Sequence, residues 1–320
     1  MEKKKGKNNV FVVIDSNAVI HRAFHALPPL KKENGEVVNA VYGFLLVLFK
    51  ILKELDPMCL AACFDLPEPT FRKQAFEQYK AKRKKAPDEL YAQIPMVKDV
   101  LRTFNVPIFE SAGYEADDVI GTLTNAKTEG ALKNAENVIV SGDLDTLQLV
   151  NKKTKVYFLS RGVKETVFYD EEKIKERYDG LSPEQIIDFK ALRGDASDNI
   201  PGVKGIGEKT AIELLKQYKD LKGVYKETEK ENSKIKGSIK EKLLKDKENA
   251  FLSYDLGRID RAVPLKIDMD AACWGGYDEK KVLKMLADFG FKSLMNKLPG
   301  AEQKTPPVAV KKIGENLKLW

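Results

Sequence analysis

The chain has 320 residues, of which 43% are hydrophobic and 32% charged, so it can bury a core for one large domain or two smaller ones. It has no apolar run of the roughly 18 residues that span a membrane, and no apolar signal core follows its lysine-rich N-terminus, which argues against secretion. Three cysteines and two histidines exclude a disulfide framework and disfavour a zinc site, while the net charge of +7 fits a nucleic-acid partner or simply a solvated lysine-rich surface.

Four short apolar runs each lead into acidic residues. In chain order the runs are 10–14, 60–64, 106–109 and 138–142. The acids that follow them are Asp15, Asp65, Glu115, Asp117, Asp118, Asp143 and Asp145. Helical patterns at 37–55, 89–104 and 116–127 separate the runs, which predicts an α/β fold with a mostly parallel sheet flanked by helices. Ligands of such sheets bind beyond the carboxyl ends of the strands, so we expect the acids to share one rim.

Residues 71–85 form a strongly basic segment that carries three aromatic side chains. On a helix, five of its side chains would fall near one face, namely Arg72, Phe76, Tyr79, Lys80 and Arg83. Such a face could hold a phosphate and stack a base, although a plain solvated helix is the alternative. Since Pro87 ends the helix, we expect a compact cover over the acidic rim.

After about residue 180 the pattern changes to helices and glycine-rich turns. A helix is expected to begin at Pro183, with Ser182 as its N-cap. Residues 222–250 are expected to form exposed helix and loop, and 280–289 and 291–298 closing helices. Residues 299–320 have no periodicity and read as a tail or linker. We therefore divide the chain into an α/β part over 1–180, a helical part over 181–298 and a tail over 299–320.

A turn with Gly202, Gly205 and Gly207 precedes one of these helices. The glycines allow close approach of the backbone, and the helix N-terminus offers N–H groups to a phosphate. Lys204 and Lys209 add positive charge, which fits a sequence-independent contact with DNA. The spacing is not G-x-G-x-x-G, which argues against a dinucleotide site. A purely structural turn is the remaining alternative.

With Asp195 and Asp198, which lie just before this turn, the candidate carboxylates number nine. They could not all ionise in one cleft without compensating cations. A chain poor in histidine favours oxygen-binding cations, Mg²⁺ or Mn²⁺. Two such ions about 4 Å apart would activate a water and stabilise the leaving oxygen of a phosphodiester. For any single Asp, a helix N-cap or a turn is the alternative.

The ordered motifs of this chain resemble the 5′-nuclease (5′–3′ exonuclease) domain of bacterial DNA polymerase I, a relative of the flap endonucleases. The resemblance covers roughly residues 10–298. It is carried by VIDSNAVIHRAFHALP, NAVYGF, PTFRKQAFEQYKAKR, GYEADDVIGT, SGDLDTLQLV and LRGDASDNIPGVKGIGEKTA. It implies a PIN-like 5′-nuclease fold with a helical arch at about 70–104 and a C-terminal helix–hairpin–helix.

The resemblance also implies roles for individual residues. Around a first metal it places Asp15, Asp65, Glu115, Asp117 and Asp118. Around a second it places Asp143, Asp145, Asp195 and Asp198. The residues expected to contact DNA are Arg22, Arg72, Tyr79, Lys80, Arg83, Gly202, Lys204, Gly205, Gly207 and Lys209. Catalytic roles fall to Lys80, Arg83, Asp117 and Asp143, and a K⁺ ion is a further expected ligand of the glycine turn.

A few positions depart from the family's pattern. His21 stands where a Tyr or Phe is expected to stack near the cleavage site, and imidazole stacks more weakly. Ser16 and Ala18 replace the usual Gly and Ser, and Leu144 replaces a usually basic residue. No departure removes a carboxylate, so we expect activity.

The sequence therefore predicts a Mg²⁺-dependent 5′-nuclease that cleaves DNA near the junction of a 5′ flap and a duplex, in replication and repair. The expected substrates are flapped, nicked or gapped duplexes, including those with RNA primers. We expect a monomeric, cytoplasmic, nucleoid-associated protein without a membrane partner, working with a polymerase domain in cis or in trans. The alternatives are a noncatalytic flap-binding module and an RNase of the same architecture. The preference between exonuclease and endonuclease action stays open.

Overall fold

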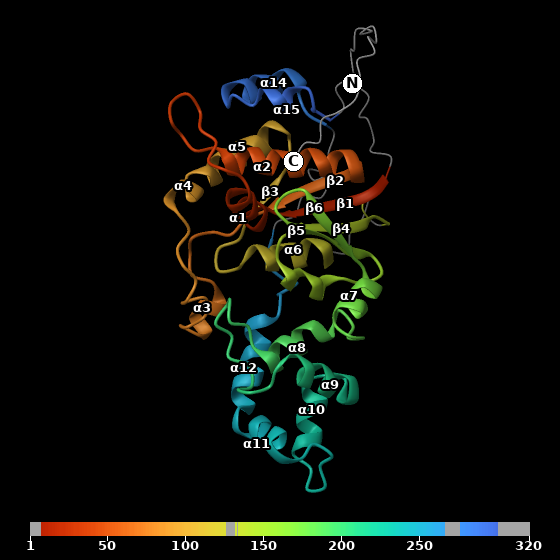
Figure 1. The fold of residues 1–320 in the computed structure, drawn as a ribbon. Coiled ribbons are helices and arrows are strands. Elements are labelled where there is room, and N and C mark those ends of the chain that lie inside the picture. The colour runs from red at the N-terminus through yellow and green to blue at the C-terminus, as the bar shows by residue number, and fades with distance from the viewer. Residues whose placement is uncertain (1–7, 126–131, 133, 266–275, 300–320) are drawn as a thin grey trace, which may run out of the picture.

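A sheet covered by helices forms the upper part of the molecule in Figure 1, and a bundle of helices lies below it. The structure is a computed structural model that describes residues 8–125, 132, 134–265 and 276–299. The predicted tail lies outside these residues beyond Pro299. Among the helices within these ranges, none is long and apolar enough to cross a membrane.

Within the described residues, six strands form one sheet in the order β3-β2-β1-β4-β5-β6. The strands are β1 (Asn8–Asp15), β2 (Pro57–Cys63), β3 (Ile108–Phe109), β4 (Glu136–Ser141), β5 (Thr154–Arg161) and β6 (Glu165–Tyr169). All neighbours are parallel except β5 and β6. The predicted, mostly parallel sheet is confirmed. The antiparallel pair β5–β6 was not foreseen.

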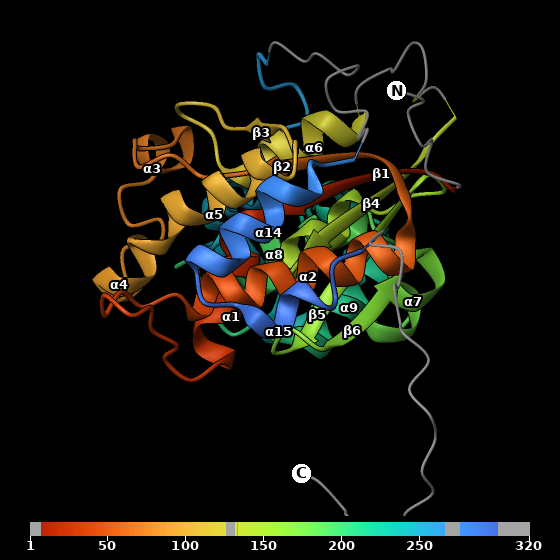
Figure 2. The same cartoon turned by 90° about the horizontal axis from the view of Figure 1, so that it is seen from above.

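Both faces of the central strand β1 are buried, because its side chains alternate between two cores. Val12 and Ile14 belong to one core, and Phe11 and Val13 belong to the other. The first core is covered by α1 (Ser16–Ala26), α2 (Asn39–Leu55), α5 (Gln93–Thr103), α14 (Glu279–Asp288) and α15 (Lys292–Met295). The second is covered by α6 (Ala116–Asn125), the 3-10 helix η2 (Leu144–Leu149) and α7 (Glu171–Arg177). Figure 2 shows α2, α14 and α15 lying over the sheet.

The helical region packs around a third core. It contains α8 (Gln185–Arg193), α9 (Glu208–Tyr218), α10 (Leu221–Thr228), α11 (Gly237–Lys245) and α12 (Lys247–Gly257). The predicted helix start at Pro183 is two residues too early, since α8 begins at Gln185. The N–H of Ser182 donates to Oε1 of Gln185 at 2.9 Å, so a turn forms here and the helix begins only after it.

The basic segment is not the continuous helix that its pattern predicts. The helix α3 (Phe71–Ala75) is short, and the next, α4 (Asp88–Tyr91), lies beyond Pro87. Lys80 has a left-handed φ of 55°, and its N–H donates to the carbonyl of Asp198 at 2.8 Å. The Tyr79 side chain is buried against Ile200. These contacts with the helical region outweigh local helix propensity.

Candidate metal and DNA site

The carboxyl ends of the parallel strands open into a cavity of about 530 Å³. Five of the predicted acids line it, namely Asp15, Asp65, Glu115, Asp117 and Asp143. Basic and imidazole side chains line it as well, namely His21, Arg22, His25, Lys80 and Arg83. The predicted convergence of strand-end acids is therefore seen. Asp143, expected with the second group, lines the cavity with the first.

Asp15 and Asp143 are held by a shared serine. Oδ1 of Asp15 caps α1 by accepting from the N–H of Ala18 at 3.0 Å, and Oδ2 accepts from the hydroxyl of Ser141 at 2.6 Å. The same Ser141 oxygen accepts from the N–H of Asp143 at 2.9 Å, and Asp143 itself caps η2. The capping alternative is thus correct for both acids, and it is compatible with their position on the cavity wall.

The remaining cavity acids come from the end of β2 and the start of α6. The N–H of Ala116, the first residue of α6, donates to Asp65 at 2.7 Å. Glu115 just precedes this helix, and Asp117 lies in its first turn. One helix terminus therefore orients three acids toward the cavity.

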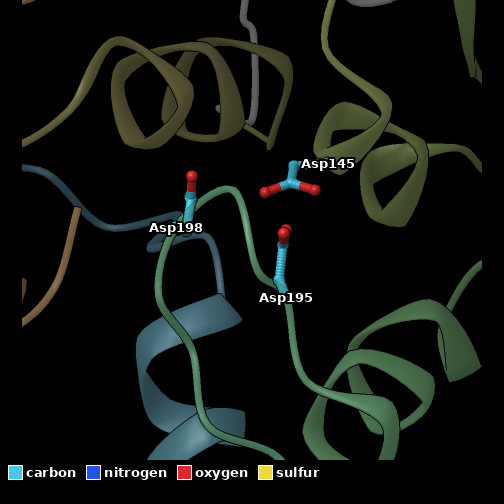
Figure 3. A group of neighbouring side chains, drawn as sticks. All are labelled: Asp145, Asp195 and Asp198. Carbon is cyan, nitrogen blue, oxygen red and sulfur yellow. The ribbon is translucent and has the colours of Figure 1, made fainter. Parts of the chain in front are cut away.

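Asp145, Asp195 and Asp198 form a second group, whose nearest ligand oxygens all lie within 4.8 Å of one another. In Figure 3, Asp195 and Asp198 extend from one loop toward Asp145. That loop is closed by paired backbone hydrogen bonds of 2.9 and 2.8 Å between Asp195 and Ile200. The 3-10 helix and the loop before the glycine turn thus build a three-carboxylate site together.

Burial and mutual repulsion perturb these acids. Burial, reinforced by the charges of Asp65 and Asp143, raises the pKa of Asp15 to about 7. Burial and the charges of Asp15 and Asp143 raise the pKa of Asp117 well above its usual range. Burial likewise raises the pKa of Asp145 to about 6, against the opposing effect of Lys190. At Asp195, burial is outweighed by Lys190 and Ser197, which lower the pKa to about 2.

Three cationic side chains pair with the acids of the two groups. Lys80 Nζ lies 2.8 Å from Glu115, Arg83 lies 2.5 Å from Asp198, and Lys190 bonds both Asp145 and Asp195. Sequence reasoning missed Lys190, although a lysine in the otherwise largely apolar stretch of α8 was a usable signal. Lys80 and Arg83 line the cavity and pair with acids of the site, which is where the sequence placed them. Their catalytic roles stay predictions.

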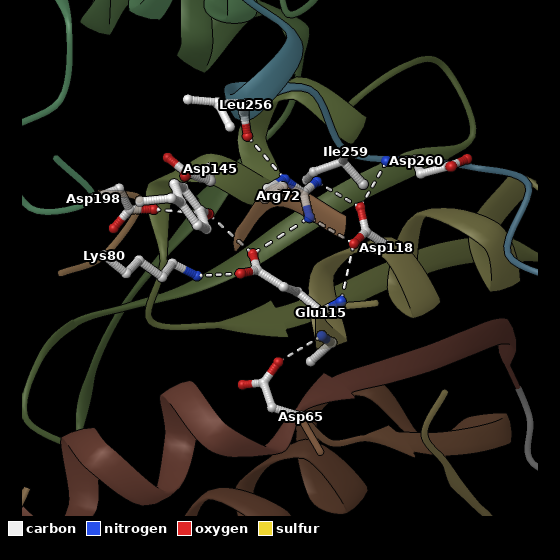
Figure 4. A network of polar contacts seen from close by, with 12 residues as sticks. Asp65, Arg72, Lys80, Glu115, Asp118, Asp145, Asp198, Leu256, Ile259 and Asp260 are labelled. Atoms are coloured by element: carbon white, nitrogen blue, oxygen red, sulfur yellow. Dashed lines mark hydrogen bonds and ion pairs between the residues drawn. The ribbon is translucent and has the colours of Figure 1, made fainter. Parts of the chain in front are cut away.

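Two expected site residues face away from the cavity and into the protein. Asp118, proposed as a metal ligand, is fully buried and accepts two 2.7 Å hydrogen bonds from Arg72. Arg72, proposed as a DNA contact, is 2% exposed, so its guanidinium is not presented to a ligand. Figure 4 shows the pair beside the bond between Lys80 and Glu115. Tyr79 is buried too, and its hydroxyl donates to Glu115 at 3.1 Å.

The glycine turn is only partly available to DNA. Gly202 has a φ of 62°, and a Cβ there would lie 2.3 Å from the backbone nitrogen of Gly194, so only glycine fits. Its N–H donates to Ser253, and the N–H of Lys204 donates to Asp246. The N–H groups of Gly202 and Lys204 are therefore bonded within the protein, and the predicted contribution of Lys204 rests on its side-chain charge. Exposed groups remain at the Lys204, Gly205, Gly207 and Lys209 positions, the last at the start of α9.

Arg22, in α1, contacts the ends of two strands at the cavity wall. Its guanidinium donates to the carbonyls of Gly142 and Ser160 at 2.9 and 3.1 Å, and it lies over the Phe158 ring. A Cβ on Gly142 would come within 2.6 Å of it. Arg22 therefore positions the ends of β4 and β5 and also lines the cavity.

The donor chemistry fits divalent cations. The ligand atoms are carboxylate oxygens. Burial, together with neighbouring carboxylates, raises the pKa of several of these acids, so a bound cation would favour their ionised form. The first group offers Asp15, Asp65, Glu115, Asp117 and Asp143 to such ions. The second offers Asp145, Asp195 and Asp198.

Solved structures of low sequence identity share this fold. The T5 D15 protein co-crystallised with metal ions aligns with a TM-score of 0.65 at 19% identity, over 87% of this chain and 99% of that one. The bacteriophage T5 flap endonuclease in a complex with DNA and metal ions aligns with a TM-score of 0.65 at 18% identity, over 88% and 99%. The catalytic core of Rad2 in complex with a DNA substrate aligns with a TM-score of 0.58 at 19% identity, over 93% of each chain.

Curated relatives are more similar in sequence but much longer. DNA polymerase I of Bacillus caldotenax is 41% identical over 299 residues, which are 92% of this chain and 33% of that protein. DNA polymerase I of Caldicellulosiruptor bescii is 43% identical over 289 residues, 90% of this chain and 33% of that protein. This chain thus spans about a third of the length of these relatives.

Two family models cover most of the chain. The model of the 5′-3′ exonuclease N-terminal resolvase-like domain matches residues 10–179, which include the sheet and the cavity acids. The model of the 5′-3′ exonuclease C-terminal SAM fold matches residues 181–280, which include Asp195, Asp198 and the glycine turn. With both models matched in order and the acids gathered at one rim, the chain belongs to the 5′-3′ exonuclease family of phosphodiester-hydrolysing 5′-nucleases.

Proposed function

We propose that this chain hydrolyses a DNA phosphodiester near the junction of a 5′ single-stranded flap and a duplex, with two divalent cations. The observation that carries the proposal is the pair of carboxylate groups, one lining the strand-end cavity and one beside the glycine turn. Flapped, nicked and gapped duplexes are the substrates we propose, including RNA primers on DNA. The preferred ions are Mg²⁺ or Mn²⁺.

The acids would hold the ions in two sets. Asp15, Asp65, Glu115, Asp117 and Asp143 would serve one region, and Asp145, Asp195 and Asp198 the other. Bound there, divalent cations lower the pKa of an attacking water and stabilise charge on the leaving oxygen. Asp118 is left out of this proposal because Arg72 occupies both of its oxygens.

Lys80 and Arg83 would bind the scissile phosphate. In the protein alone they pair with Glu115 and Asp198, so divalent ions at those acids would free both cations for the substrate. Arg22 and His21 would lie along the single strand of DNA that enters the cavity. Binding alone gains nothing from acids that repel phosphate, which disfavours a noncatalytic DNA-binding role.

The helical region, α8 to α12, would hold the duplex, whereas α14 and α15, which fall within the predicted range 181–298, pack on the sheet instead. Lys204 and Lys209 are exposed beside the start of α9, where a helix N-terminus favours an anion. A K⁺ ion at this turn and a polymerase partner in cis or in trans stay predictions of the sequence.

The direct test is Mg²⁺-dependent cleavage of a 5′-flap substrate, run beside a flush duplex and a single strand. We expect the flap to be cut fastest, with cleavage abolished by EDTA. Asp117→Ala and Asp143→Ala should each lower kcat by at least about 100-fold, since each removes a ligand carboxylate. A matched control is Asp179→Ala, which removes an exposed acid of the same type. An intact chain that cuts no substrate, or active ligand variants, would refute the proposal.

A further inference from the structure

A buried ion pair joins the basic segment to the first turn of α6. Arg72, in α3, is 2% exposed, and Asp118, in α6, is fully buried. Their contact is bidentate, with two parallel hydrogen bonds of 2.7 Å. Such a planar pair fixes orientation as well as distance.

The pair also binds the chain that follows α12. Arg72 donates to the carbonyl of Leu256 at 2.8 Å and to that of Arg258 at 2.7 Å. Asp118 accepts from the N–H of Asp260 at 2.7 Å and from the N–H of Glu115 at 3.0 Å. Figure 4 shows the guanidinium between Asp118 and the backbone of Leu256. Arg72 therefore joins its own helix to two distant stretches of the chain, the start of α6 and residues 256–258.

We call residues 256–263 the connecting segment, because they run from α12 back to α6. Further along α6, a Cβ on Gly121 would lie 2.7 Å from the Ile259 side chain, so the two run in close contact. The hydroxyl of Thr122 accepts from the N–H of Val263 at 3.0 Å. The contact therefore continues beyond Asp118 for another turn of the helix.

The connecting segment is also tied to the 3-10 helix that carries Asp145. The Gln148 amide group donates to the carbonyl of Gly257 and accepts from the N–H of Ile259, both at 3.0 Å. The Arg261 guanidinium donates to the backbone carbonyl of Gln148 at 2.8 Å. One segment thus contacts the helices that carry acids of both groups.

We propose that Arg72 and Asp118 are positioning residues that hold the first turn of α6, with Glu115 and Asp117, in a fixed orientation to the connecting segment and hence to the helical region. The inference rests on the proposed function, since the geometry that it preserves is the one between ion-binding acids and the part that holds the duplex. Asp118 acts through the backbone of Glu115 rather than as an ion ligand.

The first test separates a ligand from a positioning residue without using activity. Mn²⁺ binding is counted by calorimetry or electron paramagnetic resonance for the full chain, Asp118→Asn and its neighbour Asp117→Asn. We expect Asp118→Asn to keep the number of ions of the parent chain and Asp117→Asn to lose at least one. Loss of an ion in Asp118→Asn would overturn the proposal.

The second test is hydrogen exchange at the two amides that Asp118 accepts from, those of Glu115 and Asp260. At least one of them should exchange at least tenfold faster in Asp118→Asn and in Arg72→Met/Asp118→Asn, because the Asn amide keeps only one acceptor oxygen. The amide of Val224, bonded to Asp220 within the helical region, is the control and should not change. Unchanged exchange at Glu115 and Asp260 would contradict the proposal. This readout stands even if the parent chain cuts no flap.

The third test is a double-mutant cycle on flap cleavage. Arg72→Met, Asp118→Asn and the double variant should each lower kcat about tenfold or more with little change in KM, and the double variant should be no worse than the singles. The double variant leaves no unpaired buried charge, so it covers the case in which a single variant does not fold. Arg72→Lys should recover only part of the rate, because an ammonium cannot reproduce the fork. Additive losses, or a full rate in the double variant, would refute a shared positioning role.

Discussion

Nζ of Lys190 lies 2.8 Å from a carboxylate oxygen of Asp195, and the same atom also bonds Asp145. One lysine, only 8% exposed, therefore pairs with two of the three acids in the second group and offsets a single negative charge. A divalent cation bound by these acids would be repelled by the ammonium group of Lys190. We therefore expect Lys190 to link the stability of the protein to the proposed binding of metal ions.

Lys190→Met should destabilise the protein without divalent ions by about 1–3 kcal/mol, because two half-buried carboxylates lose their partner. Added Mn²⁺ should restore more stability in this variant than in the parent chain, since the ion takes over the lost charge. Thermal unfolding with EDTA and with Mn²⁺ measures both effects. Lys216→Met, which breaks an exposed pair with Asp179, is the control and should change little. An equal Mn²⁺ effect in all three chains would contradict the expectation.

Metal binding should release protons at mildly acidic pH. The pKa of Asp15 is about 7 in the folded protein and that of Asp145 about 6, both above the ordinary 3.8. The folded state therefore binds more protons than the unfolded state between about pH 4 and 7, so the metal-free protein loses stability as pH rises through that range. A bound cation replaces the protons and should flatten this dependence. Calorimetry at pH 6 in buffers of different ionisation enthalpy counts the protons released, and a count of zero would be contrary to this prediction.

His21→Tyr should strengthen flap binding. His21 lines the cavity at the position where the family carries a stacking aromatic residue, and a base stacked on an aromatic ring contributes about 1–3 kcal/mol. We expect His21→Tyr to lower KM for a flap several-fold with kcat nearly unchanged, and His21→Ala to raise KM. Steady-state cleavage with all three chains measures this. His25→Tyr, one turn further along α1 and lining the same cavity, tests whether any added ring suffices. An equal gain at His25 would argue against a specific stacking position.

Lys204→Ala and Lys209→Ala should weaken duplex binding and its salt dependence. Both side chains are exposed beside the start of α9. Removing one lysine that binds a phosphate should lower the slope of log affinity against log salt by about 1. Fluorescence anisotropy with a flap duplex in Ca²⁺ at several salt concentrations measures the slope. Lys175→Ala removes an exposed lysine of α7 and should leave it unchanged. A slope that stays the same in both turn variants would count against duplex binding at this turn.

The sheet and its acidic rim were predictable because they depend on local patterns. Apolar runs such as 10–14 become strands that are buried on both faces, and the acid at each end follows from parallel pairing. Leu144 packs against the second core, which explains an apolar residue between two acids. The helix after the glycine turn was predictable for the same local reason.

The roles of Arg72, Asp118 and Lys190 depend on contacts between distant parts of the chain. Arg72 bonds to Leu256 and Arg258, more than 180 positions away, and no spacing rule reveals such a pairing. A basic residue in a basic segment reads as a phosphate contact until its burial is known. The predicted helix over 71–83 failed for a related reason, because Tyr79 and Lys80 are fixed by the helical region.

The order in which the site residues occur along the chain has a consequence for synthesis. Asp15 is synthesised well before Asp195, Asp198 and the connecting segment, with strands β2 to β6 of the sheet lying between them in the sequence. N-terminal parts fold first during translation, so the sheet can form before the second acid group exists. A nascent or prematurely terminated chain therefore carries an incomplete set of acids. We therefore expect hydrolysis only from chains that extend past the connecting segment.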